Sequence, residues 1–267
     1  MSEHKVDIGI GLGSVANGDH LRQAPILDEL GFSSLWIAGG QLDRLDRVDE
    51  LLAATRTARV ATGIIPLGRY SPADVLALVG RVGTLRFVAG LGGPQSARPV
   101  TELLPHLDAL DAGGLAPRSR LLAALGPRKL ELARERADGA MTLLTTPAHT
   151  ALARDVIGAD RRLVVHQFVV DDADAARARD TARPTIEFLL GVGGYRANLR
   201  REGVSDADLE SLSDRLIDAV VAHGSRAAVA ERVAAHAAAG ADEVVLSVLP
   251  GAGEPDLVAT ARRWVAG

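Results

Sequence analysis

Eight short apolar runs alternate with amphipathic stretches along this chain, and the alternation constrains its fold more than any other feature. The runs are rich in β-branched residues, whereas the stretches between them repeat their apolar positions about every 3.6 residues, which is typical of alternating strands and helices. Ser71-Pro72 and Thr146-Pro147 have the form of helix starts. We expect strands at 6–12, 34–37, 59–65, 86–90, 121–124, 140–144, 163–170 and 243–248.

Several of these runs are apolar on both sides, as parallel strands covered on both faces are. Eight parallel strands with right-handed crossovers close most economically into a (β/α)8 TIM barrel, and an open doubly wound sheet is the alternative. The 267 residues match the roughly 250 of one such barrel. No low-complexity linker divides the chain, so we expect a single domain over residues 1–267. Segment 171–222 exceeds one barrel helix and predicts a helical insertion of two or three helices before the last strand.

Composition excludes several classes of protein. The absence of cysteine excludes disulfides, thiolate metal sites and a cysteine nucleophile. The N-terminus has no secretory signal and charged residues interrupt every apolar run, so we expect a cytoplasmic protein without a membrane span. A net charge of -4 argues against a nucleic-acid surface. None of the seven histidines has metal-pair spacing, so we predict no metal site and a small molecule as the partner.

A Gly-Pro turn with two basic residues follows the fifth predicted strand. Gly126 lets the backbone approach a ligand, and Pro127 fixes the first turn of the next helix. The free N–H groups there, together with Arg128 or Lys129, predict an anion site such as a phosphate site. An ordinary capped turn is the alternative interpretation.

Other candidates lie near the C-terminal ends of predicted strands, where barrels carry their chemistry. Gly63 predicts a bulge or a close backbone approach, and Arg69 and Tyr70 follow it as candidate pocket residues, with a plain loop as the alternative. Gln41 is a further pocket candidate. His166 reaches the pocket if it points inward, and a buried, hydrogen-bonded histidine is the alternative. No serine lies in a nucleophile elbow, so these patterns identify no catalytic residue.

Together these segments resemble the bacterial-luciferase-like superfamily, in particular its deazaflavin (coenzyme F-420) dependent oxidoreductases. The resemblance extends over nearly the whole chain, in the order that a barrel requires. Its most specific part is SRAAVAERVAAHAAAGADEVVLSV at 225–248. The other matching segments are 29–37, 60–72, 86–92, 123–139, 195–201 and 213–219.

The resemblance implies a barrel with a deazaflavin, or FMN as the alternative, across its C-terminal mouth. It implies a non-prolyl cis peptide at Gly63-Ile64 behind the cofactor ring, and a cofactor phosphate at the turn 126–128. The cofactor-binding residues that it implies are Thr62, Gly63, Ile64, Gly90, Ala124, Leu125, Gly126, Pro127 and Arg128. A small organic substrate, hydride transfer or luciferase-like monooxygenase chemistry, and a homodimer are also implied.

The chain departs from the family's pattern after the second predicted strand. Members often carry a Glu or His in the pocket there, whereas this chain reads Ala38-Gly39-Gly40-Gln41. One hypothesis is an oxidoreductase that transfers a hydride between the cofactor and a small organic substrate. A second hypothesis, motivated by the missing acid or base, is a non-catalytic cofactor-binding protein derived from such enzymes. A phosphate-binding barrel lyase or isomerase is a third.

Overall fold

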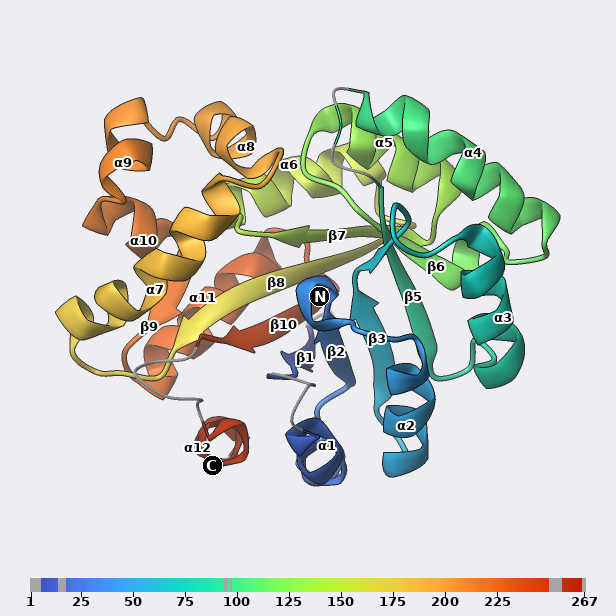
Figure 1. Ribbon diagram of the computed structural model, residues 1–267. Coiled ribbons are helices and arrows are strands. Elements are labelled where there is room, and N and C mark those ends of the chain that lie inside the picture. The colour runs from blue at the N-terminus through green and yellow to red at the C-terminus, as the bar shows by residue number, and fades with distance from the viewer. Residues whose placement is uncertain (1–5, 14–17, 94–95, 97, 250–255, 266–267) are drawn as a thin grey trace.

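The computed structural model describes residues 6–13, 18–93, 96, 98–249 and 256–265, without the side chains of Gln41 and Val265. Within these residues eight parallel strands form a closed barrel with helices around it, which confirms the predicted (β/α)8 fold (Figure 1). The barrel strands are β1 (Asp7–Gly11), β2 (Ser34–Ala38), β3 (Arg59–Gly63), β5 (Phe87–Gly92), β6 (Arg120–Ala123), β7 (Gly139–Leu143), β8 (Arg162–Val170) and β10 (Glu243–Val248).

The last strand closes the barrel by pairing with strands on both of its sides. β10 pairs with β1, where Ile8 lies opposite Val244, and with β8, where Val164 lies opposite Glu243. Two short strands lie off this ring: β4 (Ile65–Pro66) pairs with β5, and β9 (Val221–His223) extends the sheet beside the end of β8. The predicted strand 59–65 is therefore two strands, because the chain leaves the ladder at Gly63-Ile64.

Helices cover the outside of the barrel, and their first residues follow the sequence signals. Ser71 caps its helix with a complete capping box to Asp74, and Thr146 accepts a hydrogen bond from the backbone of His149 at 3.3 Å. The barrel helices are α1 (Asp19–Glu29), α2 (Asp46–Ala54), α3 (Pro72–Val82), α4 (Pro99–Ala112), α5 (Pro127–Arg136), α6 (Pro147–Ile157), α11 (Arg226–Ala238) and α12 (Leu257–Val265), with short 3-10 turns η1 (Gly39–Gln41) and η2 (Pro117–Ser119).

The segment between β8 and β9 contains four helices, so the prediction of two or three was wrong. They are α7 (Ala175–Leu190), α8 (Tyr195–Arg201), α9 (Asp206–Ser211) and α10 (Asp214–Val220). Ser205 and Ser213 each accept a hydrogen bond from the helix that they precede, so the last two helices start separately. The chain turns through positive φ at Gly194 and Gly203.

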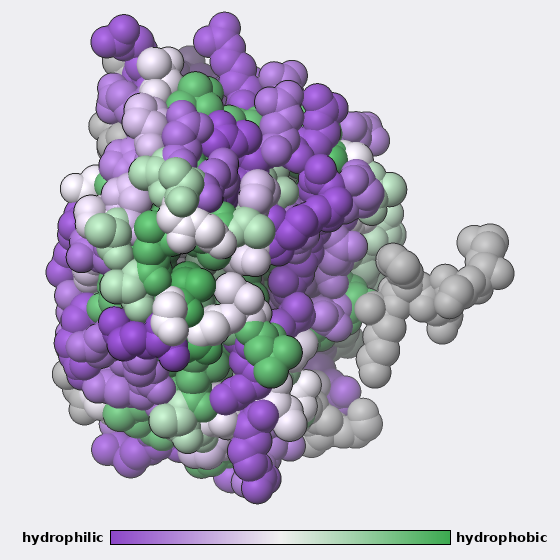
Figure 2. Space-filling model, turned by 90° about the vertical axis from the view of Figure 1, so that its right-hand side faces the viewer, coloured by the Kyte–Doolittle hydropathy of each residue, from purple (hydrophilic) through white to green (hydrophobic). Residues whose placement is uncertain are grey.

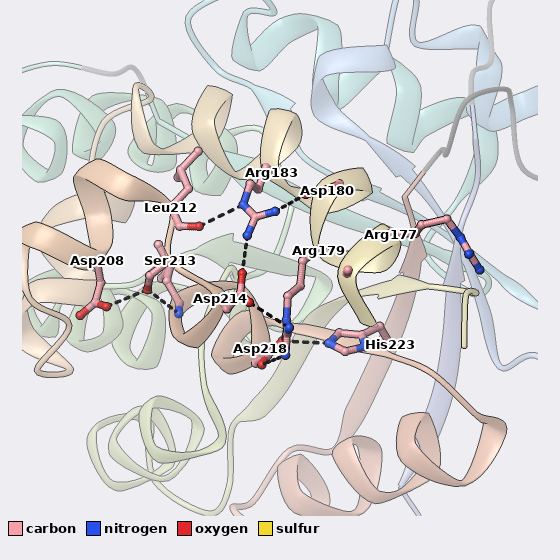
Figure 3. A network of polar contacts seen from close by, with 12 residues as sticks. Arg177, Arg179, Asp180, Arg183, Asp208, Leu212, Ser213, Asp214, Asp218 and His223 are labelled. Atoms are coloured by element: carbon pink, nitrogen blue, oxygen red, sulfur yellow. Dashed lines mark hydrogen bonds and ion pairs between the residues drawn. The ribbon is translucent and has the colours of Figure 1, made fainter. Parts of the chain in front are cut away.

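The insertion has its own apolar core and its own set of ion pairs. Its buried side chains form a cluster with the ends of β8 and β9 that includes Phe168, Ile186, Leu199 and Ile217. Figure 3 shows that arginines of α7 reach acids of α10. Arg179 contacts Asp214 at 2.9 Å and Asp218 at 2.7 Å, and Arg183 also pairs with Asp214. These contacts fix α7 and α10 as one unit beside the barrel.

The barrel interior is filled at its N-terminal end. Glu243 is fully buried and accepts a hydrogen bond from the indole Nε1 of Trp36 at 3.0 Å. Ser34 also donates to Glu243, and Arg162 forms an ion pair with it. Small and branched residues complete this interior layer: Ala61, Leu121, Met141, Val164 and Val245. Because this end is packed, the interior offers ligand space toward the C-terminal ends of the strands.

The face of the molecule drawn in Figure 2 is mainly hydrophilic. On the side where α3 and α4 lie in Figure 1, hydrophilic residues surround a central band of hydrophobic and intermediate ones (Figure 2). Among the described residues no helix is both long enough and apolar enough to cross a membrane. The same part of the chain contains no group of three or more His, Cys, Asp or Glu able to hold a metal ion.

Candidate functional site

A cavity of about 1250 Å³ opens at the C-terminal mouth of the barrel, where the chemistry of such barrels is found. It exceeds the roughly 300–1,000 Å³ of ordinary ligand pockets, so it can hold an extended ligand. The barrel residues that line it are Gly63, Ile64, Gly92, Gly93, Ser96, Arg98, Pro99, Val100, Thr101, Ala123 to Lys129, Met141, Thr142, Leu143 and His166. The insertion supplies Val192, Gly193, Gly194, Tyr195, Ala197 and Arg201.

One wall of the cavity is a backbone segment packed between glycines. The peptide bond between Gly63 and Ile64 is cis, at the position that the resemblance implies. A Cβ atom added at Gly92 would lie 1.9 Å from Cδ1 of Ile64, and one added at Gly39 would lie 2.7 Å from the amide nitrogen of Ile64. Ile64 therefore occupies the space that side chains at positions 39 and 92 would need.

His166 lies on β8 beneath this segment. A Cβ atom added at Gly63 would lie 3.1 Å from Cε1 of the imidazole, so the ring packs directly against the glycine. The ring also meets Trp36 edge-on, with centroids 4.7 Å apart and planes at 87°. Burial lowers the pKa of His166 to about 4, which keeps the ring neutral at neutral pH. Its Nε2 is buried and has no hydrogen-bond partner among the described residues. This differs from the alternative interpretation of the sequence, in which His166 is buried and hydrogen-bonded.

The opposite part of the cavity contains the N-terminus of α5. Gly126 is the N-cap and offers no side-chain oxygen, while its carbonyl accepts from the N–H groups of Lys129 at 3.0 Å and Leu130 at 3.1 Å. Pro127 occupies the first helical position, as the sequence predicts. The first residues of α5 line the cavity, so the positive end of the helix dipole borders it. This geometry suits a phosphate or carboxylate group.

Cations without carboxylate partners border the same cavity. The side chains of Arg98, Arg128 and Lys129 make no hydrogen bond or ion pair with any described residue, although most arginines in the chain are paired. Arg201 donates to the side-chain oxygen of Asn198 at 3.0 Å. Burial lowers the pKa of Lys129. Since no Asp or Glu is among the described lining residues, the cavity has a positive potential that attracts an anion.

The comparisons with known proteins identify the architecture. No protein-family model and no curated protein sequence matches the chain. Solved structures do match along nearly its full length. An F-420 dependent secondary alcohol dehydrogenase in complex with an F-420–acetone adduct aligns with a TM-score of 0.73 and 15% identity over 98% of this chain and 97% of that chain. The chain shares its barrel fold with this enzyme.

Two further structures give the same result. The coenzyme F-420 dependent tetrahydromethanopterin reductase from Methanopyrus kandleri aligns with a TM-score of 0.75 and 14% identity, over 98% of this chain and 97% of that chain. The FMN complex of the oxygenating constituent of 3,6-diketocamphane monooxygenase from Pseudomonas putida, a type II Baeyer-Villiger monooxygenase, aligns with a TM-score of 0.65 and 14% identity, over 97% and 96%. Both share the barrel fold of this chain.

Most of the candidate residues from the sequence meet at the cavity. Those that line it are Gly63, Ile64, Ala124, Leu125, Gly126, Pro127, Arg128 and His166. The sequence did not single out three other lining residues, Arg98, Tyr195 and Arg201. Tyr195 lies in a segment that matches the family, and burial raises its pKa to about 12, so the phenol keeps its proton at neutral pH.

Four candidates do not line the cavity, because their polar groups are used elsewhere. Arg69 donates to the carbonyl of Leu42 at 3.1 Å, and Tyr70 donates to the carbonyl of Asp43 at 3.0 Å, so both brace the loop after β2. The other two, Thr62 and Gly90, lie against each other in the sheet: the threonine hydroxyl donates to the glycine carbonyl at 3.0 Å. The remaining pocket candidate is Gln41. It ends η1, and its side chain lies outside the described residues.

The turn before α5 is supported from behind by α6. The Nε2 atom of His149 lies 2.9 Å from the carbonyl oxygen of Leu125, the residue before the N-cap Gly126. Because the carbonyl can only accept, this nitrogen carries the proton. His149 belongs to the first turn of α6, whose N-cap is Thr146. The anion end of the cavity is thus built on the N-terminal turns of two neighbouring helices.

Proposed function

We propose that this chain is an oxidoreductase that binds coenzyme F-420, with FMN as the alternative, in the cavity at the mouth of its barrel. The observation that carries the proposal is that one cavity joins the glycine-packed Gly63-Ile64 segment to unpaired cations at the N-terminus of α5. A flat ring with a phosphate-bearing tail has the same two chemical ends. The fold is shared with enzymes described as F-420 dependent and with one described in complex with FMN.

The residues present fit such a group. The Gly63-Ile64 segment has backbone on its surface and no side chain at positions 63 and 92, so it offers a flat wall to a ring. The N–H of Arg128 and the charges of Arg128 and Lys129 would hold the phosphate, because anions are stabilised at helix N-termini and by charge-assisted hydrogen bonds. The buried Nε2 of His166 would find a polar atom of the occupant as its partner.

When bound, a deazaflavin or flavin supplies hydride transfer, and the protein supplies position and environment. Apolar lining by Ile64, Met141 and Leu143 excludes water from the ring end of the cavity. Two lining groups bear on proton exchange. Burial holds the pKa of His166 at about 4, so its imidazole stays neutral and resists protonation at neutral pH, while the phenol of Tyr195 retains its own proton.

A second candidate function is a cofactor-binding protein that does not catalyse turnover. It is favoured by one specific observation: no carboxylate is present among the described lining residues. The position after β2 is filled by the contact between Gly39 and Ile64 instead of an acid or base. This candidate shares the cavity and the ligand with the first, and differs only in chemistry.

A fluorescence titration tests the proposal, with F-420 and FMN added separately to the purified protein. We expect saturable binding of at least one of them. Arg128→Ala should weaken it by about 1–3 kcal/mol if the side chain makes a charge-assisted contact. Arg56→Ala is the matched control, because Arg56 is an exposed arginine before β3 that does not line the cavity. Failure of both cofactors to bind would refute the proposal.

Turnover then separates the two candidates. An oxidoreductase bleaches or restores the cofactor absorbance when a panel of alcohols, aldehydes, ketones and unsaturated compounds is supplied. A binding protein holds the same cofactor without any change of its redox state across the panel. Both measurements use the protein whose affinity has been established, so an inactive result cannot arise from an empty site.

A further inference from the structure

The insertion brings a cation of its own to the anion end of the cavity. Arg201 is the last residue of α8, and its guanidinium lies against the turn that starts α5. A Cβ atom added at Gly126 would lie 3.3 Å from Nη2 and 3.8 Å from Cζ of this arginine. The cavity is therefore bordered by one cation from the insertion and by Arg128 and Lys129 from the barrel.

A chain of partly buried polar contacts holds this exposed arginine in place. Its Nη2 donates to Oδ1 of Asn198 at 3.0 Å, and Nδ2 of Asn198 donates to Oε1 of Glu202 at 2.6 Å. The other carboxylate oxygen accepts from the hydroxyl of Thr146 at 2.5 Å and from its backbone N–H at 3.3 Å. We call Thr146, Glu202, Asn198 and Arg201 the tether. It runs from the N-cap of α6 to the cavity, and α8 lies beside that end of α6 in Figure 1.

The tether and the anion site share one support. The first turn of α6 holds Glu202 through Thr146, and it holds the carbonyl of Leu125 through His149 at 2.9 Å. The barrel turn and the insertion are thus positioned by two residues at the start of α6, the N-cap Thr146 and His149. This arrangement fixes the distance between Arg201 and Gly126 without any direct hydrogen bond between them.

Arg201 also differs from two paired arginines of the insertion. Its neighbour Arg200 pairs with Asp206 at 2.6 Å, and Arg179 on α7 pairs with two aspartates. Arg201 contacts no carboxylate within ion-pair distance among the described residues, and its only hydrogen bond there is to a neutral amide. The oxygens of Glu202 are used by Asn198 and Thr146. The carboxylate of Glu202 acts on Arg201 only from beyond ion-pair distance. A guanidinium held through three other residues, with no carboxylate in direct contact among the described residues, is placed to receive an anion.

A second, independent observation supports a ligand in this cavity. At its other end the buried Nε2 of His166 has no hydrogen-bond partner among the described residues. Buried polar atoms are ordinarily paired, so a polar ligand atom beside His166 would complete the hydrogen bonding of this nitrogen. The cavity therefore presents an unmet hydrogen bond at the ring end and unmet charges at the helix end.

We propose that Arg201 is a binding residue that contacts the phosphate of the cofactor from the insertion side, opposite the N-terminus of α5. Asn198, Glu202 and Thr146 are positioning residues for it. The proposal rests on the proposed function for the identity of the ligand. It adds that the helical insertion is part of the binding site, so that phosphate binding fastens the insertion to the barrel.

The experiment compares ligands with and without the phosphate. The pairs are FMN with riboflavin, and F-420 with its chromophore lacking the phosphate tail, each titrated by fluorescence. Arg201→Gln should weaken FMN or F-420 by about 10-fold or more, as expected for a hydrogen bond to a charged group. It should leave the phosphate-free partner unchanged. Arg200→Gln is the matched control, because it removes the adjacent arginine that faces Asp206.

Raising the salt concentration provides a readout that a structural role would not change. The affinity of wild type for FMN or F-420 should fall with salt more steeply than that of Arg201→Gln, because one charge contact has been removed. Glu202→Ala tests positioning: it should weaken phosphate-bearing ligands only, and the double variant should be no weaker than Arg201→Gln alone. Additive losses would show that the tether does not act through Arg201.

The outcomes separate this inference from the proposed function. If wild type binds either cofactor and Arg201→Gln binds it equally well, the inference is overturned while the proposed function stands. An equal loss for the ligand with and without phosphate also overturns it, because the arginine then acts only on structure. If wild type binds neither cofactor, the proposed function fails. A rise in melting temperature with inorganic pyrophosphate that is lost in Arg201→Gln, but kept in Arg200→Gln, would still support the anion site.

Discussion

Gly39 and Ile64 are so close that residue 39 has no room for a side chain. An added Cβ atom would lie 2.7 Å from the amide nitrogen of Ile64 and 2.9 Å from its carbonyl oxygen, closer than real Cβ contacts. The backbone at the cis Gly63-Ile64 bond thus fills the place where the resemblance leads one to look for a Glu or His. Packing against Ile64 therefore leaves no room for an acidic or basic side chain at position 39.

Adjacent glycines allow a direct test of this contact. Gly39→Ala should lower the free energy of unfolding by about 1–3 kcal/mol, because the new methyl group meets backbone that cannot move away easily. Gly40→Ala should change it by no more than about 0.5 kcal/mol, since a Cβ atom there meets nothing within 4 Å. Urea unfolding of both variants measures the difference. Equal stabilities would show that Ile64 yields to the methyl group at little cost.

The sequence predicts the barrel well, because the barrel is a regular pattern. Each buried strand interrupts a helical period, and the eight runs that do so match the eight barrel strands within a few residues. The misses are elements without a pattern of their own. β9 has three residues and β4 has two, and each is defined by pairing with a neighbour. The insertion was undercounted because its helices are short and restart at Ser205 and Ser213.

The candidate site is predictable where chemistry is local. Gly126-Pro127 and Gly63-Ile64 stand out because glycine and proline determine backbone geometry by themselves. Arg69 failed as a pocket candidate because its guanidinium is taken by the carbonyls of Leu42 and Asp43, which only the tertiary structure brings near it. Arg201 was missed for the converse reason. Nothing in its sequence separates it from the paired Arg200.

The unpaired imidazole of His166 predicts opposite effects on stability and on binding. His166→Phe keeps a ring of similar shape beside Trp36 and removes a buried nitrogen without a partner among the described residues. The ligand-free variant should therefore be as stable as wild type or more stable, by up to about 1–3 kcal/mol. Its affinity for the cofactor or substrate that uses this nitrogen should fall by about 3- to 10-fold, or roughly 0.5–1.5 kcal/mol.

Two measurements on the same variant check this pair of effects: urea unfolding without ligand, and fluorescence titration. A loss of stability in the absence of ligand would contradict it, because the nitrogen would then have a partner within the protein. Unchanged affinity would place the occupant's polar groups away from β8. Tyr195→Phe is a useful companion, since it removes the proton-bearing hydroxyl of another lining residue.

A second buried histidine predicts how stability depends on pH. His236 on α11 is fully buried, with Nε2 2.9 Å from Oε1 of Gln167 and Nδ1 2.8 Å from the hydroxyl of Thr150. Burial, and then the nearby charges of Arg232 and His149, lower its pKa to about 4 from 6.5. His236 therefore binds a proton below about pH 6.5 in the unfolded chain, but only below about pH 4 in the folded protein.

It follows that the free energy of unfolding falls as the pH drops through this window, and that the contribution of His236 is complete only above pH 6.5. The loss from this one residue approaches about 3 kcal/mol at the acid end. His236→Gln keeps a polar side chain but removes the titration, so its unfolding free energy should fall less steeply than that of wild type. Urea unfolding in a series of buffers across the window gives both slopes. Parallel curves for the two proteins would contradict the prediction, because they would mean that protonation of His236 does not lower the free energy of unfolding.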